Sequence, residues 1–323
     1  MGGMTGLDPT IDTASNYRRF ARQEAAGRSP AYEELGLAVA EDGVVLAFLE
    51  KLPAGKRQPN LLFAASRYLL GDVPTPGSVR HLVVHRAREL AGVMATRLTQ
   101  TNEPARCATL LPALCLLPQP LALLEVGASA GLTLLADYYS YDFGGHRIAG
   151  KDDGAPVLSC SVSGPAPVPS EVPDVVWRAG IDVNPLDVNR EEDLEWLACL
   201  VWPGEEGRAQ RLAAAAAVAR RHPPPIHRGD LADDLAAVAA DAPPRATLVV
   251  FHSAVLPYVD QRKRRQFFEV VKHLGAEWLS NEAPGILPTG PADPAGGHFL
   301  LIHNGESILA ETDGHGAWIR WRP

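Results

Sequence analysis

Residues 121–135 have the sequence Leu-Ala-Leu-Leu-Glu-Val-Gly-Ala-Ser-Ala-Gly-Leu-Thr-Leu-Leu. The apolar run that ends at Val126 predicts a strand that is covered on both faces. Gly127 and Gly131 allow a tight turn, and the leucines that follow predict a helix over residues 132–139 whose N-terminus faces this turn. A strand, a glycine-rich turn and a helix in this order are typical of a nucleotide-binding loop.

The rest of the C-terminal part alternates predicted strands with predicted helices. We expect strands at 121–126, 175–182, 225–228, 247–251, 276–279, 298–302, 307–310 and 317–321, and helices at 132–139, 191–201, 205–221, 231–240 and 260–274. This alternation predicts a Rossmann-like, doubly wound and mainly parallel sheet, and the closely spaced last strands predict an antiparallel edge. The Gly- and Pro-rich segment 143–173 is too long for an ordinary crossover loop and predicts an inserted hairpin or a lid.

The N-terminal part shows only helical periodicity. Apolar residues recur at three- and four-residue spacing over 17–26, 29–52, 60–70, 78–98 and 103–117, which predicts five helices. The boundary falls near Pro118-Gln-Pro120. We therefore expect an α/β protein with an all-helical domain at 1–118, which covers the substrate, and a Rossmann-like domain at 119–323.

The bulk composition limits the class of protein and its partners. A chain of 323 residues with 46% hydrophobic residues can bury a large core. The net charge of −8 argues against a general nucleic-acid-binding surface and favours a small-molecule partner. The four cysteines form no C-x-x-C pair and no signal peptide is visible, so a cytoplasmic protein with reduced thiols is expected. Prolines interrupt the most apolar stretch, 108–126, which excludes it as a membrane span. The sequence does not indicate the oligomeric state.

The glycine turn resembles a motif of a known enzyme class. The pattern Glu125-x-Gly127-x-Ser129-x-Gly131 is similar to the first motif of class I S-adenosylmethionine-dependent methyltransferases, with Ser129 where those enzymes more commonly have glycine. The resemblance implies that Glu125 closes the first strand and that the small residues of the turn line the cofactor. It also implies methyl transfer from S-adenosylmethionine to a small-molecule acceptor.

Two further acids are candidates for cofactor recognition. Asp182 ends the second predicted strand, where a carboxylate can accept hydrogen bonds from both ribose hydroxyls, although it equally suits a cap of the next turn. Asp230 follows the third predicted strand, where it can bind the adenine amino group or simply cap the next helix.

Candidate catalytic residues follow the next two strands. His252 and Tyr258 come at the carboxyl end of a central strand, the edge where ligands bind in open α/β sheets. We expect His252 to act as a general base towards a neutral acceptor, or as a hydrogen-bonding wall. Glu282 ends the following strand, where it would orient the acceptor or lie in a solvated loop.

Polar residues at the start of two predicted N-terminal helices are candidates for acceptor binding. The first cluster is Arg57, Gln58 and Asn60, and the second is Gln100, Asn102 and Glu103. Both are expected to face the sheet edge near His252 and Glu282, because ligand sites favour domain interfaces; exposed charge and helix caps explain them equally well. His81 and His85 lack the pattern of further ligands that a metal site needs, so no metal is expected.

The same turn permits two other functions. Gly127-x-Ser129-x-Gly131 is also a literal G-x-S-x-G nucleophile elbow, in which Ser129 would attack a carbonyl with His298, His303 or His315 as its base. No strand is predicted before residue 121, whereas an elbow lies at the top of a sheet of several strands, which disfavours a serine hydrolase. A non-catalytic nucleotide-binding module is the third possibility.

Nearly the whole chain resembles one bacterial family of uncharacterised proteins, which carries a domain of unknown function. The resemblance rests on residues 55–63 (Gly-Lys-Arg-Gln-Pro-Asn-Leu-Leu-Phe), 99–103 (Thr-Gln-Thr-Asn-Glu), 124–131 (Leu-Glu-Val-Gly-Ala-Ser-Ala-Gly) and 251–254 (Phe-His-Ser-Ala). It implies family membership and no particular reaction.

Overall fold

The computed structural model describes residues 12–289 and 298–323, which form two compact units. We call residues 12–101 and 190–210 the helical unit, and residues 102–189, 211–289 and 298–323 the sheet unit. The predicted boundary near residue 118 falls within the sheet unit, between a helix that precedes the sheet and the first strand. From residue 12 onward the chain crosses between the units three times, so the helical unit is discontinuous in sequence.

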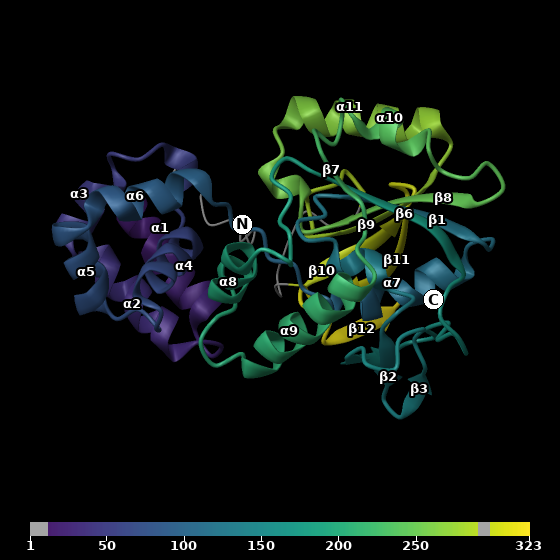
Figure 1. Cartoon of the computed structure of the whole chain (residues 1–323), viewed down its shortest axis with the longest axis horizontal. Helices are drawn as coiled ribbons and strands as arrows, with labels where there is room; N and C mark the ends of the chain where they lie inside the picture. The colour runs from purple at the N-terminus through teal and green to yellow at the C-terminus, as the bar shows by residue number, and fades with distance from the viewer. Residues whose placement is uncertain (1–11, 290–297) are drawn as a thin grey trace. The chain divides into compact units, whose positions relative to one another are not determined.

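The helical unit is built from short helices (Figure 1), and aromatic side chains form part of its core. Its elements are α1 (Thr13–Phe20), the π-helical turn η1 (Ala21–Ala25), α2 (Pro30–Glu41), α3 (Gly43–Leu49), η2 (Ala54–Lys56), α4 (Pro59–Leu70), α5 (Pro76–His85), α6 (Ala87–Thr96), α8 (Glu191–Cys199) and the start of α9 (Glu206–Arg221). Phe63 of α4 packs against the rings of Tyr17, Phe20 and Tyr32.

Two predicted N-terminal helices are each divided into two. The helix expected at 29–52 ends at Glu41, because Asp42 adopts an extended conformation and its side chain accepts hydrogen bonds from the backbone N–H groups of Val44 and Val45, which starts α3. The helix expected at 78–98 starts at Pro76, where Thr75 and Ser78 form a capping box, and is interrupted at Arg86.

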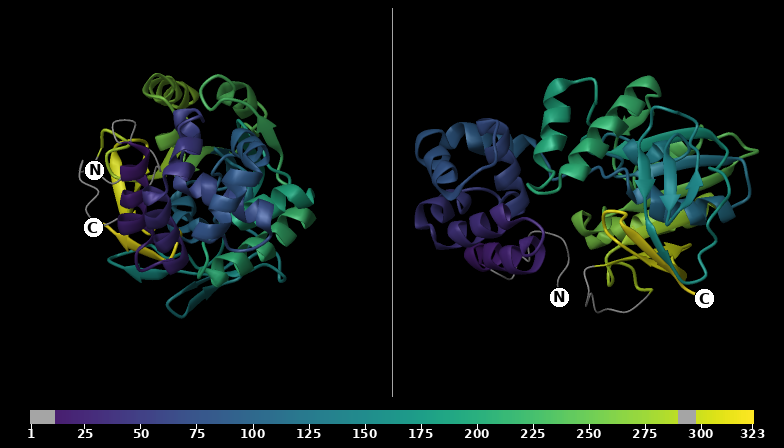
Figure 2. Two further views of the ribbon diagram at one scale, coloured as in Figure 1. Left: turned by 90° about the vertical axis from the view of Figure 1, so that its left-hand side faces the viewer. Right: turned by 90° about the horizontal axis from the view of Figure 1, so that it is seen from below.

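The sheet unit contains a nine-stranded sheet in the order β5-β12-β11-β10-β9-β8-β1-β6-β7. Its strands are β1 (Leu121–Val126), β5 (Ser161–Ser163), β6 (Val175–Asp182), β7 (Ile226–Arg228), β8 (Thr247–Ser253), β9 (Glu277–Glu282), β10 (Phe299–His303), β11 (Ser307–Thr312) and β12 (Trp318–Trp321). Strands β7, β6, β1, β8 and β9 are parallel. Strands β10, β11 and β12, in yellow in Figures 1 and 2, follow in antiparallel pairing with one another and with β9, and β5 pairs in parallel with β12 at the edge. The expected mixed α/β fold, with an N-terminal helical region and a large, mostly parallel sheet, is confirmed.

Helices cover the faces of this sheet. On one face α10 (Leu235–Ala239) and α11 (Gln261–Leu274) bury Leu235, Phe267 and Val271 against the central strands. On the other face lie α7 (Arg106–Leu116) and the single 3-10 turn η3 (Leu132–Leu135). All six residues of β1 are buried, as expected for a strand covered on both faces.

The helix predicted at 132–139 does not form, and only η3 is present. An α-helix needs its carbonyl groups for backbone bonds four residues ahead. Here the carbonyls of Leu132, Leu134 and Ala136 accept hydrogen bonds from side chains of Tyr139, Arg178 and Tyr141 instead. Two tyrosines at and just after the end of the segment, together with Arg178 of β6, therefore override its helical periodicity.

The long segment predicted as a hairpin or a lid forms further strands. Antiparallel strands β2 (Ser140–Phe143) and β3 (His146–Ile148) make a hairpin, and β4 (Val157–Ser159) pairs with β2 to give a separate three-stranded sheet. Strand β5 then adds to the edge of the large sheet by pairing with β12. The hairpin thus begins with β2, just before the predicted segment 143–173, and the segment itself supplies β3, β4 and β5.

Candidate functional site

The strand order defines one position on the sheet where a ligand is expected. The chain adds β6 and β7 on one side of β1 and then β8 and β9 on the other, so the order reverses between β1 and β8. In open α/β sheets, ligands bind at the carboxyl ends of the strands beside this switch point. Buried polar residues gather along this edge of the sheet unit: Asn102, Glu103, Arg106, Glu125, Ser129, Thr133, Asp182, His252, Ser253, Asn281, Glu282 and Thr312.

The glycine turn after β1 has the expected backbone conformation. Gly127 and Gly131 have φ angles of 71° and 70°, and Ser129 has a positive φ of 53°. A Cβ atom at Gly127 would overlap the side chain of Val255, and one at Gly131 would lie 2.7 Å from Pro224. Packing beneath the turn therefore already requires both glycines, so they are not in themselves evidence for a ligand.

Asp182 lies beside this turn although it follows Gly131 by 51 residues. Strand β6 pairs directly with β1, and Asp182 is its last residue. One carboxylate oxygen accepts a hydrogen bond from the backbone N–H of Ser129 (2.8 Å), and the other accepts one from the N–H of Asn184 (2.7 Å). Asp182 thus holds the glycine turn and also caps the loop that follows β6. The second contact is the capping role that the sequence allowed beside ribose binding.

Glu125 is the most perturbed acid at this edge. Its Oε1 accepts a hydrogen bond from the hydroxyl of Thr133, whereas its Oε2 has no hydrogen-bond partner among the described residues. The side chain is 4% exposed. Burial raises the pKa of Glu125 to about 8, the nearby charge of Asp182 acts in the same direction, and Thr133 and Arg106 oppose the shift. The carboxyl group is therefore mainly protonated at neutral pH.

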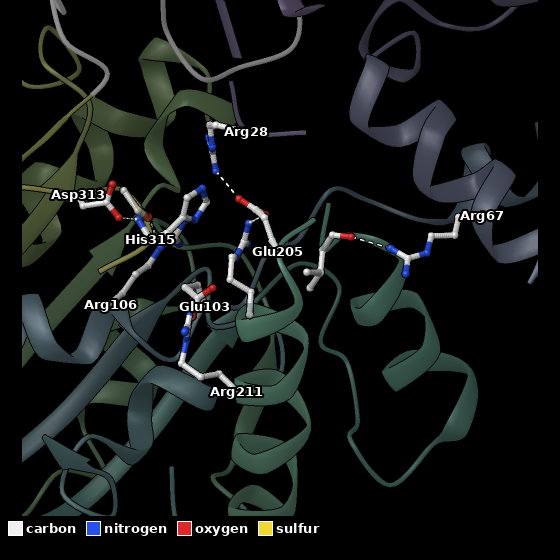
Figure 3. Close-up of polar contacts among 11 residues, drawn as sticks. Arg28, Arg67, Glu103, Arg106, Glu205, Arg211, Asp313 and His315 are labelled. Atoms are coloured by element: carbon white, nitrogen blue, oxygen red, sulfur yellow. Dashed lines mark hydrogen bonds and ion pairs between the residues drawn. The ribbon is translucent and has the colours of Figure 1, made fainter. Parts of the chain in front are cut away.

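Arg106 connects the start of α7 with two loops at the same edge. Its Nε donates to the carbonyl of Gly314 (2.9 Å) and its Nη1 to the carbonyl of Ser253 (3.0 Å). Figure 3 shows Arg106 against the loop that carries Asp313 and His315, and the neighbouring pair of Glu103 with Arg211 (3.1 Å). The cation is thus held by carbonyl groups within the sheet unit.

Two of the predicted acceptor residues belong to this part of the sheet unit. Asn102 accepts a hydrogen bond from the N–H of Leu132 (2.9 Å), which ties the segment before α7 to the end of the glycine turn. Glu103 accepts from the N–H of Ala105 and from Arg211. Both side chains are buried and hold backbone or an arginine in place.

The other predicted acceptor residues lie in the helical unit. Arg57 donates to the carbonyls of Glu50 and Leu52, and Gln58 donates to the carbonyl of Gly55 and accepts from Thr99. Asn60 Oδ1 is buried without a hydrogen-bond partner among the described residues, and Gln100 follows α6. The expectation that both clusters line one acceptor pocket with His252 and Glu282 spans the two units and stays a prediction.

His252 is part of a buried chain of hydrogen bonds. Its Nδ1 lies 2.7 Å from Glu282 Oε1, and its Nε2 accepts from the indole N–H of Trp278 (3.1 Å). Because an indole nitrogen only donates, Nε2 carries no proton and Nδ1 donates to the carboxylate. Glu282 Oε1 also accepts from the backbone N–H groups of Val255 and Leu256. His252 is 0% exposed and both of its ring nitrogens have hydrogen-bond partners, which favours the hydrogen-bonding alternative; its action as a general base stays a prediction.

The remaining predicted residues have ordinary structural surroundings. Asp230 accepts from the N–H groups of Ala232 and Asp233 and pairs with Lys263 (3.1 Å), as the helix-cap alternative requires. Tyr258, in the 3-10 turn η4 (Leu256–Tyr258), is 55% exposed.

Some polar residues of this edge were not singled out from the sequence. Thr133 is the one polar residue in the apolar run 132–135, and this isolation could have identified it from the sequence as a candidate site residue. Thr312 donates to Asn281, and Asn281 donates to Ser253, which links β11, β9 and β8. Nothing in the local sequence indicated Thr312 or Arg211.

Two general features bear on the class of site. Residues 12–289 and 298–323 contain no cluster of three or more His, Cys, Asp or Glu side chains arranged to hold a metal ion. None of the helices in these ranges combines the length and the apolar character that a membrane crossing requires.

The fold and this edge together define an α/β protein with an N-terminal helical region and a buried polar cluster at the switch point of its sheet. A family model described as an uncharacterised protein conserved in bacteria (DUF2332) matches residues 14–321, so the chain belongs to this family. The family resemblance found in the sequence is thereby confirmed. No curated protein and no solved structure matches the chain significantly.

Proposed function

We propose that this protein is an S-adenosylmethionine-dependent methyltransferase that acts on a small molecule. The observation that carries the proposal is the contact between Asp182 and the backbone N–H of Ser129 beside the switch point. It places the acid that ends the second parallel strand against the glycine turn that follows the first. Counted in chain order, the parallel strands have the order 3-2-1-4-5, as in nucleotide-binding Rossmann folds.

The residues at this edge suit the recognition of a ribose and of a charged group. Asp182 ends the parallel strand beside the turn and directs its carboxylate to the backbone N–H groups of Ser129 and Asn184, the position from which an acid binds ribose hydroxyls in related folds. The unpartnered oxygen of Glu125 is a second polar group beside the turn. When bound, the cofactor supplies an electrophilic methyl group.

The contribution of the chain to the rate is mainly positional in this proposal. Holding an acceptor in line with a reactive carbon removes most of the entropic cost of the reaction. We assign no proton transfer to His252, because Trp278 and Glu282 engage both of its ring nitrogens. The acceptor is therefore expected to be a group that is nucleophilic without a histidine base.

Calorimetry tests the proposal directly. We expect S-adenosylmethionine and its demethylated product, S-adenosylhomocysteine, to bind the purified protein, and Asp182→Asn to weaken binding at least tenfold. The control is Glu277→Gln, at the opposite edge of the sheet, where Glu277 pairs with His303. It should leave binding unchanged. Absence of heat and of a melting shift with both compounds at millimolar concentration would refute the proposal.

One observation favours the alternative function, a serine hydrolase. Ser129 has a positive φ, and a nucleophile elbow holds its serine in a strained turn. Of the candidate bases, His303 pairs with Glu277 at the amino end of β9, on the opposite edge from Ser129. His298 and His315 remain, since both adjoin strand ends on the same edge as Ser129. Labelling by a fluorophosphonate that Ser129→Ala abolishes would favour the hydrolase; we expect no labelling.

A further inference from the structure

Three side chains of the sheet unit form a chain of hydrogen bonds that ends at the carboxyl edge of the sheet. The hydroxyl of Thr312 on β11 donates to Asn281 Oδ1 on β9 (2.7 Å). Asn281 Nδ2 donates to the hydroxyl oxygen of Ser253 (3.1 Å), the last residue of β8. Thr312 and Asn281 are 0% exposed, whereas Ser253 is 7% exposed. The chain therefore begins in the interior and ends at a residue that keeps some exposed surface.

Burial fixes the direction of this chain. An asparagine side chain has one accepting end and one donating end, and a hydroxyl group has a single proton to donate. Among the described residues, the only acceptor for the proton of Thr312 is Asn281 Oδ1. The reversed amide would leave that proton buried without a partner, which is costly. The Nδ2 group therefore faces Ser253, and the Ser253 oxygen accepts a hydrogen bond from it.

The proton of the Ser253 hydroxyl is consequently available to a ligand, because none of the described residues accepts it. The backbone around this hydroxyl is held in place from two directions. The carbonyl of Ser253 accepts from Arg106 Nη1 (3.0 Å), and the N–H of Ala254 donates to the carbonyl of Asn281 (3.1 Å). Ser253 is therefore a fixed hydrogen-bond donor at the end of β8.

Ser253 lies beside the glycine turn. Strand β8 pairs with β1 so that Phe251 is in register with Glu125. Ser253 comes two residues after Phe251, which puts its side chain on the same face of the sheet and next to the start of the turn. The loop that follows Ser253 also reaches the turn, since a Cβ atom at Gly127 would overlap the side chain of Val255. The hydroxyl is thus close to the turn that lines the cofactor in the proposed function.

We propose that the Ser253 hydroxyl binds a carboxylate of the methyl acceptor, so that the substrate is a carboxylic acid and the product is its methyl ester. This inference rests on the proposed function. The free proton of Ser253 requires a ligand atom that accepts, and the positive charge of Arg106 at the Ser253 carbonyl favours an anion. A carboxylate is also nucleophilic without a base, which agrees with the assignment of no proton transfer to His252.

The transfer balances without a proton. One carboxylate oxygen forms a bond to the methyl carbon, and the bond between this carbon and the sulfonium sulfur breaks, with its electron pair passing to sulfur. The carboxylate and the sulfonium lose their charges together. Ser253 holds the second carboxylate oxygen and so orients the first one towards the methyl group. Asn281 and Thr312 are positioning residues, because they direct the Ser253 proton away from the interior.

Transfer to bacterial small molecules tests the substrate class, since the family is conserved in bacteria. The purified full chain is incubated with methyl-labelled S-adenosylmethionine and a deproteinised small-molecule extract of a bacterial culture. Mild alkali hydrolyses methyl esters to methanol, whereas methyl groups on nitrogen, carbon or an ether oxygen remain attached. We expect alkali to release the transferred label as methanol.

Substitutions along the chain test the role of Ser253. Ser253→Ala should lower the rate of transfer roughly tenfold or more, the loss expected for a hydrogen bond to a charged group. Asn281→Asp should lower it as much, because a carboxylate at this position accepts the Ser253 proton itself. The double variant should lose no more than either single variant, since both remove the same donor. Ser253→Thr keeps the hydroxyl and should retain transfer. The matched control is Ser280→Ala, a buried serine beside Asn281 on the same strand, which should leave transfer unchanged.

Calorimetry with S-adenosylmethionine separates this inference from the proposed function. Ser253→Ala and Ser280→Ala should bind the cofactor with wild-type affinity, because the hydroxyl holds the acceptor. Cofactor binding together with alkali-stable label, with no transferred label, or with equal rates for Ser253→Ala and the wild type overturns the inference and leaves the cofactor assignment standing. Absence of cofactor binding refutes the proposed function and, with it, this inference.

Discussion

At the scale of single residues, the burial of Glu125 makes the stability of the ligand-free protein depend on pH. The pKa of Glu125 rises from its ordinary 4.5 to about 8 in the folded state. Between these values the folded state holds a proton that the unfolded state releases. The contribution of Glu125 is thus fully present below about pH 4.5 and is lost as pH rises to about 8, by about 1.4 kcal/mol per unit at most.

Glu125→Gln removes this dependence and should therefore stabilise the protein at high pH. We expect the variant to match the wild type in urea unfolding at pH 5 and to be more stable by several kcal/mol, on the order of 1.4 kcal/mol per pH unit crossed, at pH 9. Comparing the two proteins at each pH cancels the contribution of other titrating groups. A stability difference that does not change between pH 5 and pH 9 would show that the pKa of Glu125 is ordinary.

A second residue, Asp137, should dominate the stability of the segment after η3. It is 0% exposed, and its carboxylate accepts two hydrogen bonds from Arg178 (2.8 and 3.0 Å) and pairs with Lys151 (3.0 Å). Removing one partner of a buried ion pair leaves the other charge without compensation, which costs about 3–5 kcal/mol.

Asp137→Ala is therefore expected to lower the free energy of unfolding by about 3 kcal/mol or more. The control is Glu41→Ala, which removes an exposed pair with Arg18 and should cost under about 1 kcal/mol. Denaturant unfolding of the two variants gives both values. Equal losses in the two variants would contradict the buried-pair argument.

At the scale of elements, the strands were the most predictable part of the fold. β1 and β6 have the predicted bounds, because apolar runs flanked by Gly, Pro or acidic residues mark buried strands. Helix ends were less predictable where a side chain competes for the backbone. Asp42 ends α2 and begins α3 within one apolar pattern, and the carbonyls of η3 are taken by Tyr139, Arg178 and Tyr141.

The role of Asp42 in starting α3 can be tested by substitution. Its side chain caps α3 through Val44 and Val45 and also pairs with Arg80 (2.6 Å). Asp42→Ala should cost about 1–2 kcal/mol, because both the cap and the pair are lost. Asp42→Asn keeps a capping oxygen and should cost less than half as much. If both substitutions destabilise equally in thermal melts, the ion pair rather than the cap starts α3.

The candidate site was predictable in its backbone positions and less so in its contacts. Strand ends located Glu125, Asp182, His252 and Glu282 at one edge, since parallel strands present their carboxyl ends together. The sequence did not reveal that Trp278 occupies His252 Nε2, because this contact joins two strands through side-chain packing. Local patterns identify positions, whereas hydrogen-bond partners depend on tertiary structure.

At the scale of the whole molecule, the helical unit is completed by a segment far along the chain. Residues 190–210 supply Trp202, which packs on Phe20 and Tyr32, and the carbonyl of Val201, which accepts from Arg67 (2.7 Å; Figure 3). They also supply Trp196, whose indole N–H donates to the carbonyl of Leu98. Residues 12–101 therefore lack part of their own core.

This arrangement predicts how fragments of the helical unit behave. Residues 12–101 alone should unfold with low cooperativity, since the aromatic core is open where Trp202 belongs. Joining residues 190–210 to them through a flexible linker should restore a cooperative transition in circular dichroism. Trp202→Ala in the joined fragment should then lower its stability, by less than the roughly 3–5 kcal/mol of a fully buried aromatic residue because Trp202 is only half-buried. Cooperative unfolding of residues 12–101 at the same midpoint as the joined fragment would mean that the distant segment adds nothing to this core.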